Sequence, residues 1–221
     1  SPLGGGISNL ASYNETVYAL APSGTNLYVG GSFRVVAGNV NSSMIAKWDG
    51  NNWSSLGAGI TVNDPDVNAV VNAIAVVGSN VYAGGSFICN GAMTGTTNIA
   101  RWNGVAWSSL SGRVNGAIYT MAVIGNDLYV GGSFTIVGNP ASNIAKWDGN
   151  SWSALSGSGS GSGAVSDLAV YNGELYVFRS GGSLTKWNGS AWSTPSITNM
   201  FAIIESMGMD DGHLYLSGTT P

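Results

Sequence analysis

The chain has 221 residues, enough for one large β domain or two ordinary ones with a buried core. Only 8% of its residues are charged, against roughly 25% in an average soluble domain, and the net charge is −4. The 7 scattered basic residues exclude the electrostatic footprint of a nucleic-acid-binding protein, and the 44% hydrophobic content excludes a disordered chain.

Glycine, serine, asparagine and threonine take the polar role that charged residues usually play. A neutral polar surface of this kind is typical of secreted or surface-displayed proteins, so we expect an extracellular or cell-surface location. No apolar run of about 18 residues occurs, which predicts no membrane span in this segment. Cys89 is the single cysteine, so neither an intrachain disulfide nor a cysteine-based metal site is expected.

Taken in chain order, the first 60 residues predict four short strands. The first is VYALAP from Val17, and the second is LYVGGSF from Leu27, after a Ser-Gly-Thr-Asn turn. A Gly/Asn/Ser loop leads to MIAKW from Met44, and an Asp-Gly-Asn-Asn turn leads to WSSLG from Trp53. Runs rich in Val, Ile, Tyr and Trp between such turns are the signature of strands and hairpins, and no segment shows a helical period.

This four-strand pattern then repeats along the chain. LYVGGSF recurs as VYAGGSF from Val81 and LYVGGSF from Leu128, and decays to LYVF from Leu175 and LYLSG from Leu214. The AKWDGNNW unit recurs three times and contains all 8 tryptophans, in the pairs Trp48/Trp53, Trp102/Trp107, Trp147/Trp152 and Trp187/Trp192. Four strands repeating every 40–50 residues or so indicate a β-propeller; a β-helix has shorter rungs, and a sandwich would not repeat its sequence so faithfully.

We therefore predict a single all-β propeller domain over 1–221, built of four-stranded antiparallel blades. The expected parts are a blade tail at 1–10, full blades at 11–60, 66–112, 113–158 and 164–197, and a partial blade at 201–221. The opening SPLGG matches the residues after a repeat tryptophan, and the sequence ends after a second strand. This favours a segment of a longer chain; the alternative is that the two termini share one blade without its third strand.

The repeated Gly-Gly pairs are expected to have a structural role in the second strand of the first three blades. Glycine weakens a strand interior, so these pairs are expected to mark a bulge or a close approach of neighbouring backbone near a crowded axis. The pairs are Gly30-Gly31, Gly84-Gly85 and Gly131-Gly132.

The pattern [LV]Y[VA]GG, then a loop, then [KR]W[DN]G-x-x-W resembles the kelch and galactose-oxidase-type propeller repeat. The repeat sequence YVGGSF…IAKWDG..WSALG is more similar still to propeller repeats of fungal cortical-marker proteins and of secreted bacterial surface proteins. The resemblance implies the fold over nearly the whole chain. It implies little about activity, because propellers host enzymes, lectins and scaffolds alike.

Each tryptophan pair flanks a four-residue turn, which places its two members opposite each other on adjacent strands. The favoured interpretation is a packing role, since an aromatic cross-strand pair stabilises a hairpin by roughly 0.2–1 kcal/mol. The alternative is a platform in each blade that stacks on sugar rings, as in propeller lectins. A basic residue precedes the first tryptophan of each pair and is expected on the opposite blade face, where a repeated anion site is the less favoured reading: Lys47, Arg101, Lys146 and Lys186.

The remaining candidate sites are weak. Asp64 and Asp66, in the acidic stretch TVNDPDVN, could offer oxygen ligands to Ca²⁺, but an ordinary solvated turn is favoured. His213 follows Asp210-Asp211-Gly212 in a turn and is a poor metal or catalytic candidate. GSGSGSG at 157–163 lacks the lysine and helix of a phosphate loop and is interpreted as a flexible connection. Four sequons are possible glycosylation sites: Asn14, Asn41, Asn52 and Asn188.

No carboxylate pair stands out as an acid/base couple, and no cofactor is predicted. The sequence thus favours a non-enzymatic, extracellular structural or adhesive module that contacts a protein partner or assembles with itself through loops and open blade edges. The alternatives are a carbohydrate-binding propeller, which would bind glycans, and a non-catalytic propeller segment of a larger secreted enzyme.

Overall fold

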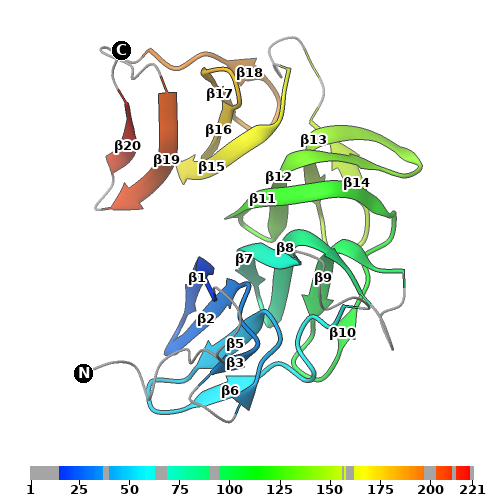
Figure 1. The fold of residues 1–221 in the computed structure, drawn as a ribbon. Helices are drawn as coiled ribbons and strands as arrows, with labels where there is room; N and C mark the ends of the chain where they lie inside the picture. The colour runs from blue at the N-terminus through cyan, green and yellow to red at the C-terminus, as the bar shows by residue number, and fades with distance from the viewer. Residues whose placement is uncertain are drawn as a thin grey trace. The chain divides into compact units, whose positions relative to one another are not determined.

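The structure is a computed structural model that describes residues 15–36, 40–62, 69–89, 95–155, 157, 162–196, 203–210 and 213–219. Every regular element in these residues is a β-strand, as the repeat predicts (Figure 1). Four sheets have four strands each, and a two-stranded pair follows them. The fold is therefore an all-β propeller type with four blades and a partial fifth. Contacts divide the chain into two compact units, Ser1–Ile118 and Tyr119–Pro221.

The first unit contains blades one and two. Blade one has the strand order β1-β2-β5-β6, with β1 (Val17–Ser23), β2 (Asn26–Gly31), β5 (Ile45–Trp48) and β6 (Trp53–Ser55). Blade two has the strands β7 (Val70–Val77), β8 (Asn80–Ile88), β9 (Thr97–Trp102) and β10 (Trp107–Ser108). The expected loop after Phe33 also holds a short hairpin of β3 (Val35–Val36) and β4 (Val40–Asn41), since valine favours the strand conformation.

The second unit contains most of blade three, blade four and the partial blade. Blade three has β11 (Val114–Ile124), which begins in the first unit, then β12 (Asp127–Ile136), β13 (Asn139–Trp147) and β14 (Trp152–Ala154). Blade four has β15 (Val165–Tyr171), β16 (Glu174–Arg179), β17 (Ser183–Trp187) and β18 (Trp192–Ser193). The partial blade is the antiparallel pair of β19 (Ile203–Asp210) and β20 (His213–Thr219).

The cores lie between neighbouring blades. In the first unit, Ile45 and Leu56 of blade one pack with Val71 and Ile74 of blade two. In the second unit, one cluster joins blades three and four, and another joins blade four to the partial blade through Met207. Because blade four packs on both faces, its strands lose the clean apolar–polar alternation of a sheet with one solvated face.

The two glycines of a pair make room for different neighbours. A Cβ on Gly31 would lie 1.9 Å from the carbonyl oxygen of Thr16, just before β1 of the same blade. A Cβ on Gly30 would lie 2.6 Å from Cγ1 of Val71, on the first strand of the next blade. The β1 strand is also bulged opposite this pair, between Val17 and Ala19. The close approach expected from the sequence is therefore present on both sides of the strand.

Gly131 offers a direct test of this packing. A Cβ there would lie 2.5 Å from Cγ1 of Val165 and 2.9 Å from Cγ2 of Thr120, two buried β-branched side chains that have little freedom to move aside. We expect Gly131→Ala to destabilise the second unit by about 1–3 kcal/mol through overpacking, measured by urea unfolding. The control is Gly208→Ala, in a strand of the same unit where an added Cβ meets nothing within 4 Å. Equal unfolding midpoints for the two variants would refute this explanation of the pair.

Candidate functional site

The two tryptophans of each pair lie on a hairpin whose turn is stabilised by an Asp or Asn side chain. In the first, the Asp49 carboxylate accepts hydrogen bonds from the backbone N–H of Asn52 (2.7 Å) and of Asn51 (2.9 Å). These two bonds, the Asn52 bond foremost, lower the pKa of Asp49. Gly50 supplies the positive φ of 103° that the turn needs. Asn103, Asp148 and Asn188 make the same two side-chain-to-backbone contacts in the other blades.

Each turn sets the two tryptophans opposite each other. Trp48 is paired in register with Trp53, and the other three pairs have the same register. The ring centroids are 5.1–5.6 Å apart and the planes are tilted by 50–54°. These are the cross-strand pairs expected from the four-residue spacing.

The surroundings of the rings favour packing over sugar stacking. Trp53, Trp147 and Trp152 are buried, and the other five tryptophans are half-buried. The indole N–H of Trp107 donates to the carbonyl of Leu56 in the preceding blade (2.7 Å), which ties one hairpin to its neighbour. A sugar platform needs an open ring face, and these rings are largely covered by the blades themselves.

The basic residues lie in register with the repeat tyrosines: Tyr28–Lys47, Tyr82–Arg101, Tyr129–Lys146 and Tyr176–Lys186. Lys146 forms an ion pair with Asp127 (3.0 Å) and Lys186 with Glu174 (2.7 Å). The hydrogen bond to the carboxylate raises the pKa of each lysine. These two lysines are already neutralised, which argues against an anion site repeated in every blade.

The other predicted site residues are scattered. Asp64, Asp66 and Asn14 lie outside the described residues, and Asn41 lies in β4. Asn52 and Asn188 are exposed in hairpin turns, so both sequons are sterically open. Within the described ranges, no group of three His, Cys, Asp or Glu side chains could hold a metal ion, and no helix is long and apolar enough to cross a membrane.

Cys89 is buried, and burial raises the pKa of its thiol to about 12. It is therefore a protonated packing residue at neutral pH and not a reactive thiolate.

Two functional candidates were missed by the sequence analysis, and both lie in blade four. Asp167 is a half-buried carboxylate that accepts hydrogen bonds from Met207 N (2.6 Å), Leu168 N (2.8 Å) and the Thr120 hydroxyl (3.1 Å). It thereby links strands of three successive blades, and burial raises its pKa. The sequence signal was faint, since only tertiary packing brings these groups together.

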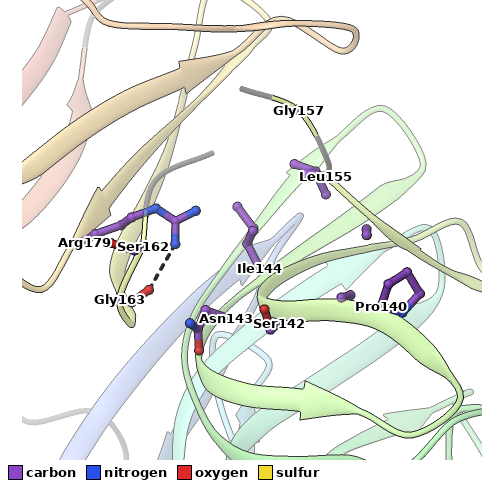
Figure 2. Close-up of a pocket in the computed structure, with 11 residues that line it drawn as sticks. Pro140, Ser142, Asn143, Ile144, Leu155, Gly157, Ser162, Gly163 and Arg179 are labelled. Carbon is purple, nitrogen blue, oxygen red and sulfur yellow. Dashed lines mark hydrogen bonds between the residues drawn. The ribbon is translucent and has the colours of Figure 1, made fainter. Parts of the chain in front are cut away.

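Arg179 is the second missed residue. It lies in β16 in register with Val165, as Gly31 lies in register with Val17, so arginine stands where the first three blades carry the second glycine of the pair. Its side chain is 2% exposed and lines a cavity of about 530 Å³ (Figure 2). The replacement of Gly-Gly by Phe178-Arg179 in the repeat was the available signal.

The fold and the hairpin geometry define a β-propeller in which each of the four full blades contains a cross-strand pair of tryptophans. A model of the family described as the Rax2 C-terminal beta propeller domain matches residues 60–209, and the chain belongs to this family. The family is one of cell-surface and cortical proteins, which agrees with the cortical-marker resemblance of the repeat. No curated protein matches the chain.

Three solved structures are similar to the chain at low identity. The computationally designed Ika8 protein is 18% identical, with a TM-score of 0.52 over 95% of this chain and 57% of that chain. The computationally designed Ika4 protein is 18% identical, with a TM-score of 0.46 over 82% of this chain and 96% of that one. YCF48 bound to D1 peptide is 15% identical, with a TM-score of 0.46 over 84% of this chain and 54% of that one. The chain thus spans little more than half the length of Ika8.

Proposed function

We propose that this chain is a non-enzymatic, extracellular structural module of a cell-surface protein, and that it contacts protein partners through open blade faces. Family membership supports the surface role. The use of the tryptophan pairs in packing supports a scaffold. The observation that carries the proposal is an apolar face of blade one that no described residue of the first unit covers.

Leu20, on β1, is the centre of this face. Counted back from the repeat tyrosine, Leu20 occupies the position that Ile74 holds in blade two and Leu168 in blade four. Ile74 is 9% exposed and packs against Gly30 of blade one, and Leu168 is 6% exposed in a cluster with Tyr129 of blade three. Leu20 is 63% exposed, beside the exposed Tyr18. The same position is therefore buried in blades two and four, and at Met207 in the partial blade, but open in blade one.

The complementary surface is open as well. In blades three and four the repeat tyrosines, Tyr129 and Tyr176, are buried against the next blade. Tyr215 holds this position in the partial blade and is 55% exposed. We propose that the Leu20 face of one molecule packs on the Tyr215 face of a second copy, in the way that neighbouring blades pack within the chain. Such a head-to-tail contact is heterologous, so it builds rings or filaments of several copies.

Sedimentation velocity over a concentration series tests this function. We expect a concentration-dependent series of oligomers for the chain and a shift toward monomer for Leu20→Ser, because serine removes most of the apolar area at the contact. The control is Val105→Ser, which removes an apolar side chain that is 84% exposed in a hairpin turn. A chain that stays monomeric at every concentration, or a Leu20→Ser variant that associates as the parent does, contradicts the proposal.

A further inference from the structure

The strongest unassigned site is the cavity beside Arg179, which lies within the second unit between blades three and four. Pro140, Ala141, Ile144 and Leu155 form apolar walls, and Ser142 and Asn143 add polar groups on the blade-three side. Figure 2 shows Arg179 reaching across from β16 toward Ile144. At about 530 Å³, the cavity is large enough for a small organic molecule.

Arg179 is an unusual group for such a place because its charge is buried without an acidic partner. One terminal nitrogen, Nη1, donates to the carbonyl of Gly163 (3.1 Å), and Nε is buried with no hydrogen-bond partner. The ion pairs found among the described residues use other cations, Lys146 and Lys186. Burial also lowers the pKa of the guanidinium. A buried and uncompensated charge is costly, so a fold that keeps one calls for a compensating anion.

The equivalent residues of blade two make hydrogen bonds to the next blade that, among the described residues, the blade-three residues lining this cavity do not make. There Thr97 Oγ1 (2.8 Å) and Asn98 Nδ2 (3.0 Å) both donate to the carbonyl of Val114, where the chain enters blade three. Ser142 and Asn143 are their counterparts in the repeat. Asn143 Oδ1 accepts a hydrogen bond from the N–H of Phe134 (3.3 Å), as Asn98 Oδ1 does from Phe87. No bond from either side chain to the entry of blade four is found within the described ranges. The donors that bond the next blade in blade two thus lack that bond in blade three, where Ser142 and Asn143 line the cavity.

We propose that this cavity binds a small molecule through a carboxylate group. Arg179 donates to the carboxylate from the edge formed by Nε and the second terminal nitrogen, since Nη1 already donates to the carbonyl of Gly163. Two parallel N–H···O bonds from one guanidinium match the geometry of a planar carboxylate. The amide of Asn143 and the hydroxyl of Ser142 provide further donors, and Ile144 and Leu155 cover the carbon body of the ligand. One positive charge in an otherwise neutral lining favours a monoanion over a phosphate dianion.

Calorimetric titration of the chain with benzoate tests the site, with benzamide as the neutral analogue of the same shape and inorganic phosphate as the competing anion. We expect saturable benzoate binding, with benzamide and phosphate each at least about tenfold weaker, because the two charge-assisted bonds contribute most of the affinity. Absence of benzoate binding, or equal binding of benzamide or phosphate, overturns the proposal.

The variants make the test specific to the residue. Arg179→Gln should weaken benzoate binding at least about tenfold. Arg179→Gly restores the residue of the other blades, so it tests the same loss if glutamine disturbs folding. The matched control is Arg113→Gln, an exposed arginine that lines the equivalent cavity of blade two, and it should leave benzoate binding unchanged. Benzoate binding that survives both Arg179 substitutions, or that is lost equally in Arg113→Gln, also overturns the proposal.

Discussion

Trp147→Ala is expected to lower the free energy of unfolding of the second unit by about 3–5 kcal/mol, since removing a large buried side chain leaves a cavity. Trp147 is 4% exposed, and its ring lies 5.1 Å from that of Trp152 across the hairpin. The measurement is urea unfolding followed by circular dichroism, because replacing one tryptophan also changes the fluorescence of the chain.

The matched control is Val137→Ala, in the turn between β12 and β13 of the same unit, where the valine is exposed. This substitution should change stability by less than about 0.5 kcal/mol. The opposite pattern would identify the tryptophans as a binding platform. In that case Trp147→Ala would lose little stability, and it would fail to bind simple sugars that the parent chain binds in the same titration.

Asp167→Ala is expected to cost about 1–3 kcal/mol, because the backbone N–H of Met207 loses its acceptor and that of Leu168 keeps only the Thr120 hydroxyl. Met207 N loses its bond to Oδ2, and Leu168 N and the Thr120 hydroxyl lose theirs to Oδ1. Asp167→Asn should lie between the parent and the alanine variant, since it keeps one oxygen. Urea unfolding of the three proteins gives the comparison.

Asp127→Ala is the control for this set, because Asp127 also bonds a neighbouring strand but its side chain is 33% exposed. Its surface ion pair with Lys146 should contribute no more than about 1 kcal/mol. A loss in Asp167→Ala as small as that in Asp127→Ala would show that the carboxylate does not link the blades.

The pH dependence of the Asp167 set follows from burial. Burial raises the pKa of this carboxyl above its unfolded value, so the folded state binds the proton more tightly. The parent should therefore gain stability relative to Asp167→Asn as the pH falls through the raised pKa toward about 3.9, the ordinary value for aspartate.

Local chemistry explains which parts of the fold were predictable. The turn residues at Asp49–Asn52 set the hairpin by contacts within four residues, so the Trp48–Trp53 register follows from spacing alone. The Gly-Gly pairs indicate a close approach for the same reason, because a missing Cβ is visible in the sequence. The particular neighbours of Gly30 and Gly31 were not predictable, since they belong to different strands.

The missed residues depend on contacts between blades. Asp167 reads as one more exposed carboxylate until Thr120 and Met207, about 40 or more residues away, are brought beside it by the stacking of blades. In the sequence, Arg179 is only a departure from the Gly-Gly repeat. The structure shows that its side chain lines a cavity whose other lining residues are neutral. Departures from a repeat are therefore the positions where a function specific to one blade is best sought.

The central claim is that the Leu20 face of the first unit and the Tyr215 face of the second unit are contact surfaces for another copy. A direct test mixes a Leu20→Cys chain with a Tyr215→Cys chain and adds a short bis-maleimide, which the buried thiol of Cys89 does not reach. We expect the mixed Leu20→Cys/Tyr215→Cys dimer to accumulate well above either dimer of like chains. Absence of cross-linked product, or all three dimers in the proportions of random encounter, would contradict the account.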